Sequence, residues 1–147
     1  MSRWIKLQTQ EDVDILMNRF GGFRDACLMK LHYKSGAWKE DDFIYFGPEM
    51  GRELHMVFDS KWGKRLELCF IGVRRFSVAG WQEDFCCDIF DCHFAFHTGL
   101  LRNEEVPLLV WADDEMFDPT EWDNLGYLDE PMVSVVFADE AKWRFLD

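Results

Sequence analysis

The chain has 147 residues, with 28 acidic against 16 basic side chains and a formal net charge of -12. This length allows one domain with a substantial core, and a hydrophobic content of 48% is too high for a disordered acidic tail. The acidity argues against general binding to nucleic acid, which depends on lysine and arginine side chains that neutralise phosphates. We therefore expect a single globular domain over residues 1–147.

The sequence favours a cytoplasmic location. No run of about 18 apolar residues occurs, so no membrane-spanning helix or membrane partner is expected. The first residues lack the basic-then-apolar pattern of a secretory signal. The cysteines are odd in number and lack the spacing of a disulfide framework, as in proteins that keep free thiols in a reducing compartment. They are Cys27, Cys69, Cys86, Cys87 and Cys92.

The first predicted element is a helix that follows Thr9 and ends at Gly21. Threonine is a favourable N-cap, and apolar residues recur with helical spacing from Val13 to Phe20. Glycine readily adopts the left-handed conformation that ends a helix. Because only one face of this helix is apolar, we expect it to pack on a sheet.

After the helix, apolar and polar residues alternate with the period of two that is typical of strands. Strands are predicted at residues 26–33, 43–46, 53–58, 66–71, 76–78, 85–97, 108–112 and 132–138, and residues 143–145 are expected to extend the last of them after a kink. The runs at 53–58 and 66–71 are separated by turn residues and predict a hairpin. Asp118-Pro119 signals the start of a second, short helix that ends near Gly126.

These elements predict an α+β fold that is mainly β. Strands and helices do not alternate regularly, which argues against a parallel doubly wound sheet. We expect an antiparallel sheet of about six to eight short strands, folded as a half-barrel or a sandwich, with the N-terminal helix packed on it.

A group of cysteine and histidine residues contains the ligand types that zinc prefers. Its members are Cys86, Cys87, Cys92, His93 and His97. On an extended strand Cys92 points away from both histidines. The two histidines would lie about 13 Å apart and are not expected to share an ion. Asp91 and His93 share a face and are the least unfavourable metal pair, but no metal or other cofactor is predicted.

Recognisable catalytic and nucleotide-binding motifs do not occur in the sequence. It contains no G-x-S-x-G, no G-x-G-x-x-G and no Walker A motif. The acidic stretch 113–118 resembles a calcium loop but lacks the required glycine. No catalytic residue is predicted, and an enzyme or metal site that uses the group at 86–97 is kept as a further alternative.

The negative charge is concentrated in the last third of the chain. Residues 1–103 carry 14 basic and 15 acidic side chains, whereas residues 104–147 carry 2 basic and 13 acidic ones. Acidic and aromatic residues are interleaved over 104–130, as in a surface that steers a basic partner by charge and anchors it with rings. The predicted contact residues are Asp113, Asp114, Glu115, Asp118, Glu121, Trp111 and Trp122. Alternatively, the rings face the core and the acids only keep the protein soluble.

The sequence therefore predicts a non-enzymatic binding protein for a basic protein partner, of inhibitor or immunity type. A small apolar ligand-binding β protein is the alternative, because a curved sheet rich in phenylalanine and tryptophan can hold an apolar pocket. A homo-oligomer would bring the basic residues within 61–75 against the acidic region 104–130 of another subunit.

Two stretches resemble a group of small uncharacterised bacterial proteins. One is Phe23-Arg24-Asp25-Ala26-Cys27-Leu28 with the following Tyr33–Ala37, and the other is Lys142-Trp143-Arg144 near the end of the chain. The order of the β runs between them is also similar. Where that group has F-H-D, this chain has Arg24, so no catalytic His–Asp pair is expected there. The group has no established activity, and the resemblance implies none.

Overall fold

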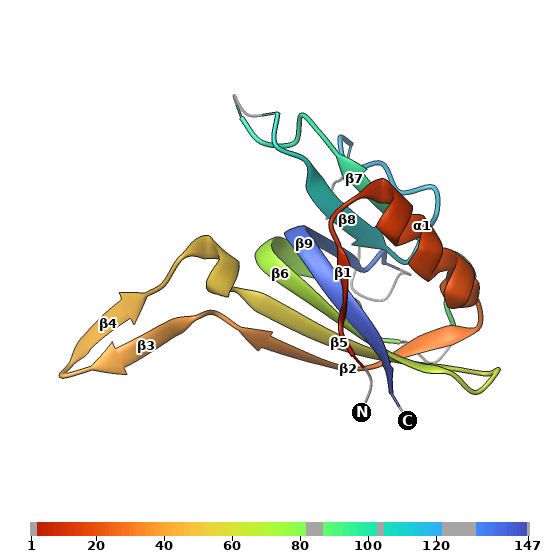
Figure 1. The fold of residues 1–147 in the computed structure, drawn as a ribbon, viewed down its shortest axis with the longest axis horizontal. Helices are drawn as coiled ribbons and strands as arrows, with labels where there is room; N and C mark the ends of the chain where they lie inside the picture. The colour runs from red at the N-terminus through yellow and green to blue at the C-terminus, as the bar shows by residue number, and fades with distance from the viewer. Residues whose placement is uncertain (1–2, 82–86, 103–104, 122–131, 147) are drawn as a thin grey trace.

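The computed structural model describes residues 3–81, 87–102, 105–121 and 132–146, and within them one helix packs on an antiparallel sheet (Figure 1). The strands are β1 (Ile5–Leu7), β2 (Ala26–Lys34), β3 (Ala37–Glu40), β4 (Phe43–Phe46), β5 (Glu53–Ser60), β6 (Arg65–Ser77), β7 (His93–His97), β8 (Leu108–Ala112) and β9 (Val135–Leu146). Seven of them form the main sheet, in the order β2-β5-β6-β9-β8-β7 with β1 also paired to β9, while β3 and β4 form a separate pair. The predicted α+β, mainly β fold is confirmed.

Helix α1 (Gln10–Arg19) begins as the sequence predicts. The Thr9 hydroxyl accepts a hydrogen bond from the Asp12 N–H at 3.2 Å, and the Asp12 carboxylate accepts one from the Thr9 N–H at 3.1 Å. This capping box satisfies backbone donors that the first turn would otherwise leave unpaired. Val13, Leu16 and Phe20 are fully buried, so the apolar face of α1 lies on the sheet.

The hairpin of β5 and β6 is the most regular part of the sheet and was predicted from its alternation. Leu54, Met56 and Phe58 are fully buried on the side of α1, as are the apolar residues that alternate along β6. Between them, Glu53 and His55 lie on the opposite face, which we call the outer face. His55 pairs in register with Cys69.

The sheet is curved, and its inner face is filled by aromatic rings. Phe58 on β5 and Trp111 on β8 belong to strands that are not neighbours, yet their ring centroids are 5.5 Å apart. The ring of Phe23, which follows α1, packs edge-on against Phe58 at 5.1 Å and lies 6.0 Å from Trp111. These contacts across the inner face match the predicted half-barrel.

The structure corrects two of the predicted elements. Within the described residues of the 85–97 run, only His93–His97 is a strand. The runs at 66–71 and 76–78 are parts of the single strand β6. Residues 143–145 extend the last strand, as predicted, within β9. Asp118 accepts hydrogen bonds from the Thr120 and Glu121 N–H groups, as the N-cap of a helix does, within a turn. The rest of that predicted helix lies outside the described residues.

Strand β2 departs from simple alternation. A β-bulge shifts its pairing with β5 between Leu28 and Lys30, so that Ala26, Leu28 and Leu31 face the core and Met29 is exposed. One extra residue in a strand reverses the side on which every later side chain lies. None of the described helices is long and apolar enough to cross a membrane.

Candidate functional site

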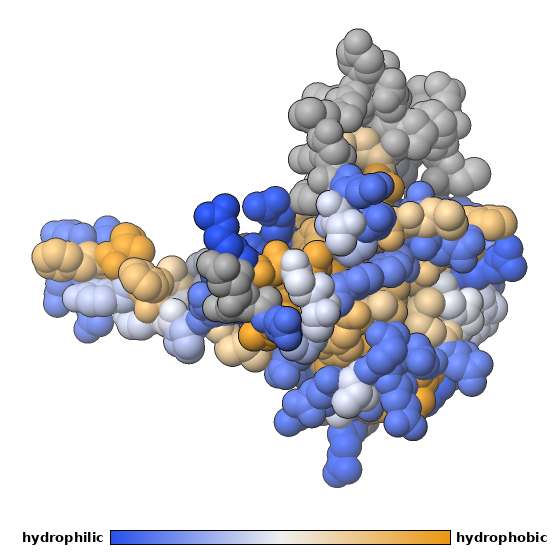
Figure 2. All heavy atoms as spheres, turned by 90° about the horizontal axis from the view of Figure 1, so that it is seen from above, coloured by the Kyte–Doolittle hydropathy of each residue, from blue (hydrophilic) through white to orange (hydrophobic). Residues whose placement is uncertain are grey.

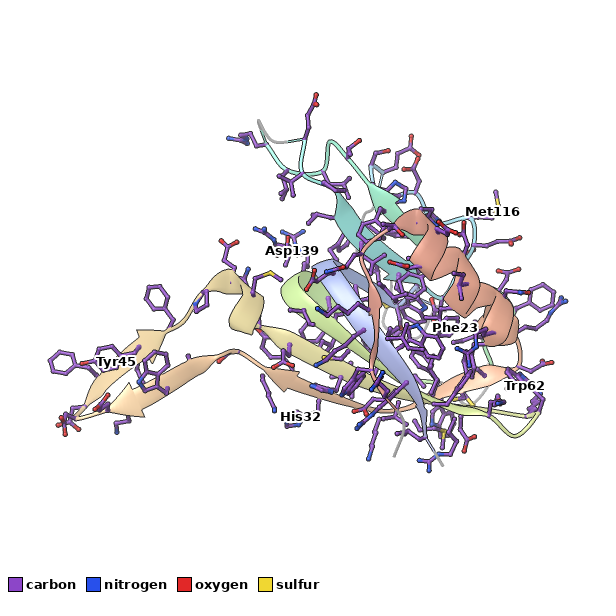
Figure 3. The ribbon with its side chains drawn as sticks, viewed as in Figure 1. Phe23, His32, Tyr45, Trp62, Met116 and Asp139 are labelled. Carbon is purple, nitrogen blue, oxygen red and sulfur yellow. The ribbon has the colours of Figure 1, made fainter. Side chains whose placement is uncertain are left out.

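The hairpin of β3 and β4 projects from the body of the molecule beyond the ends of β2 and β5, and we call it the arm (Figures 1 and 3). All eight of its strand residues are exposed. Its large apolar side chains and their exposed fractions are Phe46 (85%), Ile44 (69%), Phe43 (66%), Trp38 (50%) and Tyr45 (43%). Figure 2 shows apolar side chains gathered at the projecting end of the arm.

Both faces of the arm are apolar. Trp38 and Tyr45 are paired in register, and their rings stack with centroids 5.7 Å apart. Phe46 and Ile44 lie on the opposite face. A two-stranded hairpin is at best marginally stable alone in water, and exposed apolar patches in soluble proteins mark interaction sites. The arm therefore has the exposed apolar surface that is typical of an interaction site.

The tip of the arm carries two aspartates in an unfavourable backbone conformation. Asp41 and Asp42 have φ angles of 50° and 72°, and their neighbours Glu40 and Phe43 are paired in register. Positive φ at both central residues defines a type I′ turn, which strongly prefers Asn-Gly. Aspartate suits the first of these positions, but the second prefers glycine, so the left-handed conformation of Asp42 costs about 1 kcal/mol. The chain thus carries carboxylates at its most projecting point in spite of this cost.

Sequence reasoning missed the arm as a functional site, although one signal was available. The run Phe43-Ile44-Tyr45-Phe46 is apolar at every position, so neither of its faces is marked for solvent. Such a run is typical of a strand that is buried on both faces, and turn residues confine this one to a short hairpin.

The predicted anchor Trp111 is not on the surface. It is 1% exposed, and all five residues of β8 are buried, so the prediction that this ring contacts a partner is wrong. The cause is the place of β8 inside the sheet, between β7 and β9, where apolar side chains on both faces are covered. Trp122 lies outside the described residues.

Three of the predicted contact carboxylates hold the backbone of their own loop. Asp113 accepts a hydrogen bond from the Ser134 N–H at 2.8 Å, and burial raises its pKa to about 6. Asp114 accepts one from the Met116 N–H at 2.9 Å, and Asp118 accepts two from Thr120, which lower its pKa. Glu115 and Glu121 are exposed. The described part of this segment therefore lacks the predicted combination of exposed rings with exposed acids.

The basic residues within 61–75 do not form one patch. Lys61 pairs with Asp88, and Arg65 lies 3.8 Å from Asp59 at the start of β6. Arg74, near the other end of β6, contacts Asp139 at 3.0 Å. Nine residues of extended strand separate Arg65 from Arg74 by about 30 Å. A homo-oligomer built on this basic group would therefore need two contact surfaces.

In the cysteine and histidine group, Cys92 points away from the two histidines, as the sequence predicts, but the predicted distance between the histidines is wrong. Cys92 faces the core, where its Sγ lies 3.8 Å from the Met17 sulfur. The Nε2 atoms of His93 and His97 are only 2.7 Å apart, so the argument from backbone spacing was wrong. The two imidazoles lean toward each other along the strand, and burial lowers the pKa of both. At this distance one ring donates its N–H to the other.

The other predicted ligand, Asp91, contributes to loop structure. Its carboxylate accepts a hydrogen bond from the Glu115 N–H at 3.3 Å. Cys87 is exposed and Cys86 lies outside the described residues. Within the described part of the chain, this group supplies a histidine pair and no set of three clustered ligands.

A pocket of about 320 Å³ opens between β2 and residues 78–81 and 87–89. Its walls combine apolar side chains such as Leu28 and Trp111 with the Cys27 thiol and the Asp113 carboxyl. This volume is at the lower end of the range for small-molecule sites. The apolar ligand-binding alternative stays a prediction.

Comparisons with known proteins assign no residue of the arm or of the other clusters. No family model matches the chain, and neither a curated protein nor a solved structure matches it.

Proposed function

We propose that the protein is a non-enzymatic, cytoplasmic binding protein whose arm docks onto a basic protein partner. The observation that carries this proposal is the arm itself, in which exposed rings flank the carboxylates of Asp41 and Asp42 at a projecting tip. Rings supply the anchors that dominate binding energy, and acids steer and orient a basic partner. This is the combination that the sequence predicted for residues 104–130, found on another element of the chain.

Charge favours a basic partner over a second copy of the chain. With a net charge of -12, two copies repel each other at low salt, whereas a basic protein is attracted. Residues other than glycine that are held in the left-handed conformation cluster at functional sites, and Asp42 stands where the turn prefers glycine. We therefore expect Asp41 and Asp42 to face basic side chains of the partner.

The exposed surface of the arm is sufficient for the centre of an interface. Four rings at the observed exposures offer on the order of 500 Å² of apolar surface, since each aromatic side chain can bury about 150–250 Å². A standard interface takes about 800 Å² from each partner. The arm supplies most of this area, and the adjoining ends of β2 and β5 complete it.

The test compares capture of soluble cell proteins by four immobilised full-length chains. They are the wild type, the ring variant Phe43→Ser/Phe46→Ser, the tip variant Asp41→Asn/Asp42→Asn, and the matched control Glu115→Gln/Glu121→Gln. The control removes the same number of charges from the predicted acidic segment. We expect one basic protein to bind the wild type and the control, to be lost from the ring variant, and to bind the tip variant at least about tenfold more weakly.

Two outcomes would overturn the proposal. If the control loses the partner while the ring and tip variants keep it, the contact lies on the acidic segment instead of the arm. If sedimentation equilibrium finds that the wild type is a dimer and the ring variant is a monomer, the arm binds a second copy of the chain. Far-UV circular dichroism of every variant checks that the sheet is intact.

A further inference from the structure

On the outer face of the sheet, three side chains of the β5–β6 hairpin converge. Glu53 and His55 share this face of β5, and Cys69 on β6 is the register partner of His55. On the neighbouring strand β2, His32 lies on this same face because it pairs in register with His55, and it is labelled in Figure 3. The hairpin thus brings together a carboxylate, an imidazole and a thiol, all of which are zinc ligand types.

The three ligand atoms form a nearly equilateral triangle. Cys69 Sγ lies 3.5 Å from His55 Nε2 and 3.5 Å from Glu53 Oε1, and the third edge, from His55 Nε2 to Glu53 Oε1, is also 3.5 Å. Zinc binds such atoms at about 2.0–2.3 Å with tetrahedral geometry, which places two ligand atoms about 3.3–3.6 Å from each other. The triangle therefore matches one face of a zinc tetrahedron without rearrangement.

The orientation of the imidazole is fixed by groups behind it. His55 Nδ1 lies 3.2 Å from Glu67 Oε2, and Arg144 holds the other oxygen of Glu67 with two hydrogen bonds of 2.8 and 2.7 Å. With its Nδ1 proton donated to Glu67, His55 presents the lone pair of Nε2 to Cys69 and Glu53. A carboxylate behind a metal-binding histidine is the usual supporting arrangement in zinc sites.

The same geometry argues against a catalytic thiol. Cys69, His55 and Glu67 are arranged like a nucleophile, a base and an orienting acid, but the Cys69 side chain is 0% exposed and out of reach of a substrate. Binding of Zn²⁺ would instead release the proton of the Cys69 thiol to solvent, and the resulting thiolate and the Glu53 carboxylate would balance the charge of the ion.

The cations around the cluster are held by other groups. Lys142, the register partner of Cys69 on β9, places its amine 4.7 Å from the centre of the Trp4 ring. Arg144 binds Glu67 and also lies over Trp4, at 4.3 Å. The Trp4 ring in turn packs edge-on against His55 at 6.3 Å, and the side chains of Glu53 and His55 stay 32% and 21% exposed.

We infer that Glu53, His55 and Cys69 bind one Zn²⁺ ion, with the fourth coordination position open to solvent. The ion would bear two anionic ligands and one neutral ligand, which leaves the site without net charge. Three protein ligands and one open position also allow an exogenous ligand to bind the ion. This inference is independent of the arm, since all three ligands lie in the body of the molecule.

The test uses Co²⁺ as a spectroscopic probe on the full chain after treatment with a chelator. We expect one Co²⁺ per chain, with a thiolate-to-cobalt charge-transfer band and the visible bands of tetrahedral geometry, all removed by Zn²⁺. Cys69→Ser should lose the charge-transfer band and bind more than about 100-fold more weakly. Glu67→Gln, which alters a positioning residue, should keep the band and lose about 10–100-fold in affinity.

Matched variants locate the site. Cys27→Ser and His97→Gln, which remove a thiol and an imidazole elsewhere, should bind Co²⁺ like the wild type. No charge-transfer band in the wild type at saturating Co²⁺, or wild-type affinity in Cys69→Ser, would overturn the site. Should Cys69→Ser fail to fold, Glu53→Gln decides, since this partly exposed side chain can change without loss of core packing. An affinity unchanged in Glu53→Gln contradicts the inference, and a loss of about tenfold or more supports it.

Discussion

The arm and the β5–β6 hairpin are built alike, as two antiparallel strands joined by a short turn, but they use their aromatic residues in opposite ways. In the β5–β6 hairpin, Phe58 and Phe70 are fully buried under the inner face of the curved sheet. In the arm, Phe43 and Phe46 are 66% and 85% exposed. The difference shows that apolar strands form a core only where a second layer of the same chain covers them.

The two hairpins also differ in pattern. β5 alternates apolar with polar residues, so that one face is marked for the core and the other for solvent. β4 is apolar on both faces, and all four of its residues are exposed. Three variants test the contrast between the buried hairpin and the exposed one, and a fourth tests the buried carboxyl of Asp113.

Phe58→Ala should have the largest effect. The ring packs against Phe23 and Trp111, so its removal leaves a cavity that the surrounding rings cannot fill. We expect the free energy of unfolding, measured by urea denaturation, to fall by about 3–5 kcal/mol. A loss below about 1 kcal/mol would contradict the assignment of this hairpin to the core.

Asp113→Asn should stabilise the protein at neutral pH. Because the folded-state pKa of Asp113 is raised from 3.8 to about 6, its contribution to stability is full below 3.8 and is lost as the pH rises through 6. We expect the free energy of unfolding of the variant to exceed that of the wild type by about 3 kcal/mol near pH 7, and the gap to close near pH 4. The control, Glu121→Gln, removes an exposed charge from the same segment and should show no such gap. A constant gap across this pH range would contradict the prediction.

Asp41→Asn/Asp42→Gly should stabilise the arm and weaken its proposed binding at once. The new residues suit the positive φ angles of the tip, so we expect about 1 kcal/mol of local stabilisation. Hydrogen exchange of the β3 and β4 amides should then slow about fivefold, while affinity for the basic partner falls. If hydrogen exchange slows but the affinity is unchanged, the carboxylates of the tip do not contribute to binding.

Phe46→Ala should have the smallest effect on stability, although it deletes the same ring as Phe58→Ala. We expect a change of less than about 0.5 kcal/mol in the free energy of unfolding, because the ring is almost fully solvated. Urea denaturation of both variants under the same conditions checks the contrast. A loss above about 2 kcal/mol would show that the arm is covered in the isolated protein.

Local patterns predicted the elements of the body but not the surfaces. The cap at Thr9 and the alternation of β5 and β6 are encoded within a few residues, and α1 and the hairpin formed as expected. Whether Trp111 is buried depends on which strands flank β8, and no local pattern contains that information. For the same reason the exposed rings of the arm were not recognised as a contact element.

The cluster of Glu53, His55 and Cys69 could have been predicted in part from the sequence. The predicted turn between β5 and β6 is centred near Trp62, and a hairpin folded about that point places His55 opposite Cys69, as observed. The distance from Glu53 to this pair depends on side-chain rotamers and on the twist of the sheet, which spacing does not give. The contact between His93 and His97 was misjudged because backbone separation was used in place of the reach of two leaning side chains.

The pairing of β9 has a consequence for how the chain acquires its structure. This strand joins β6 on one side, and β8 and β1 on the other, and it follows all three in the sequence. Sheets closed by distant segments fold slowly, because the entropy of loop closure is lost before the contacts form. During synthesis, the edges of β6 and β8 stay unpaired until residues 135–146 have left the ribosome. Until then the nascent chain exposes apolar strands that can aggregate, and chaperone binding is most valuable in this interval.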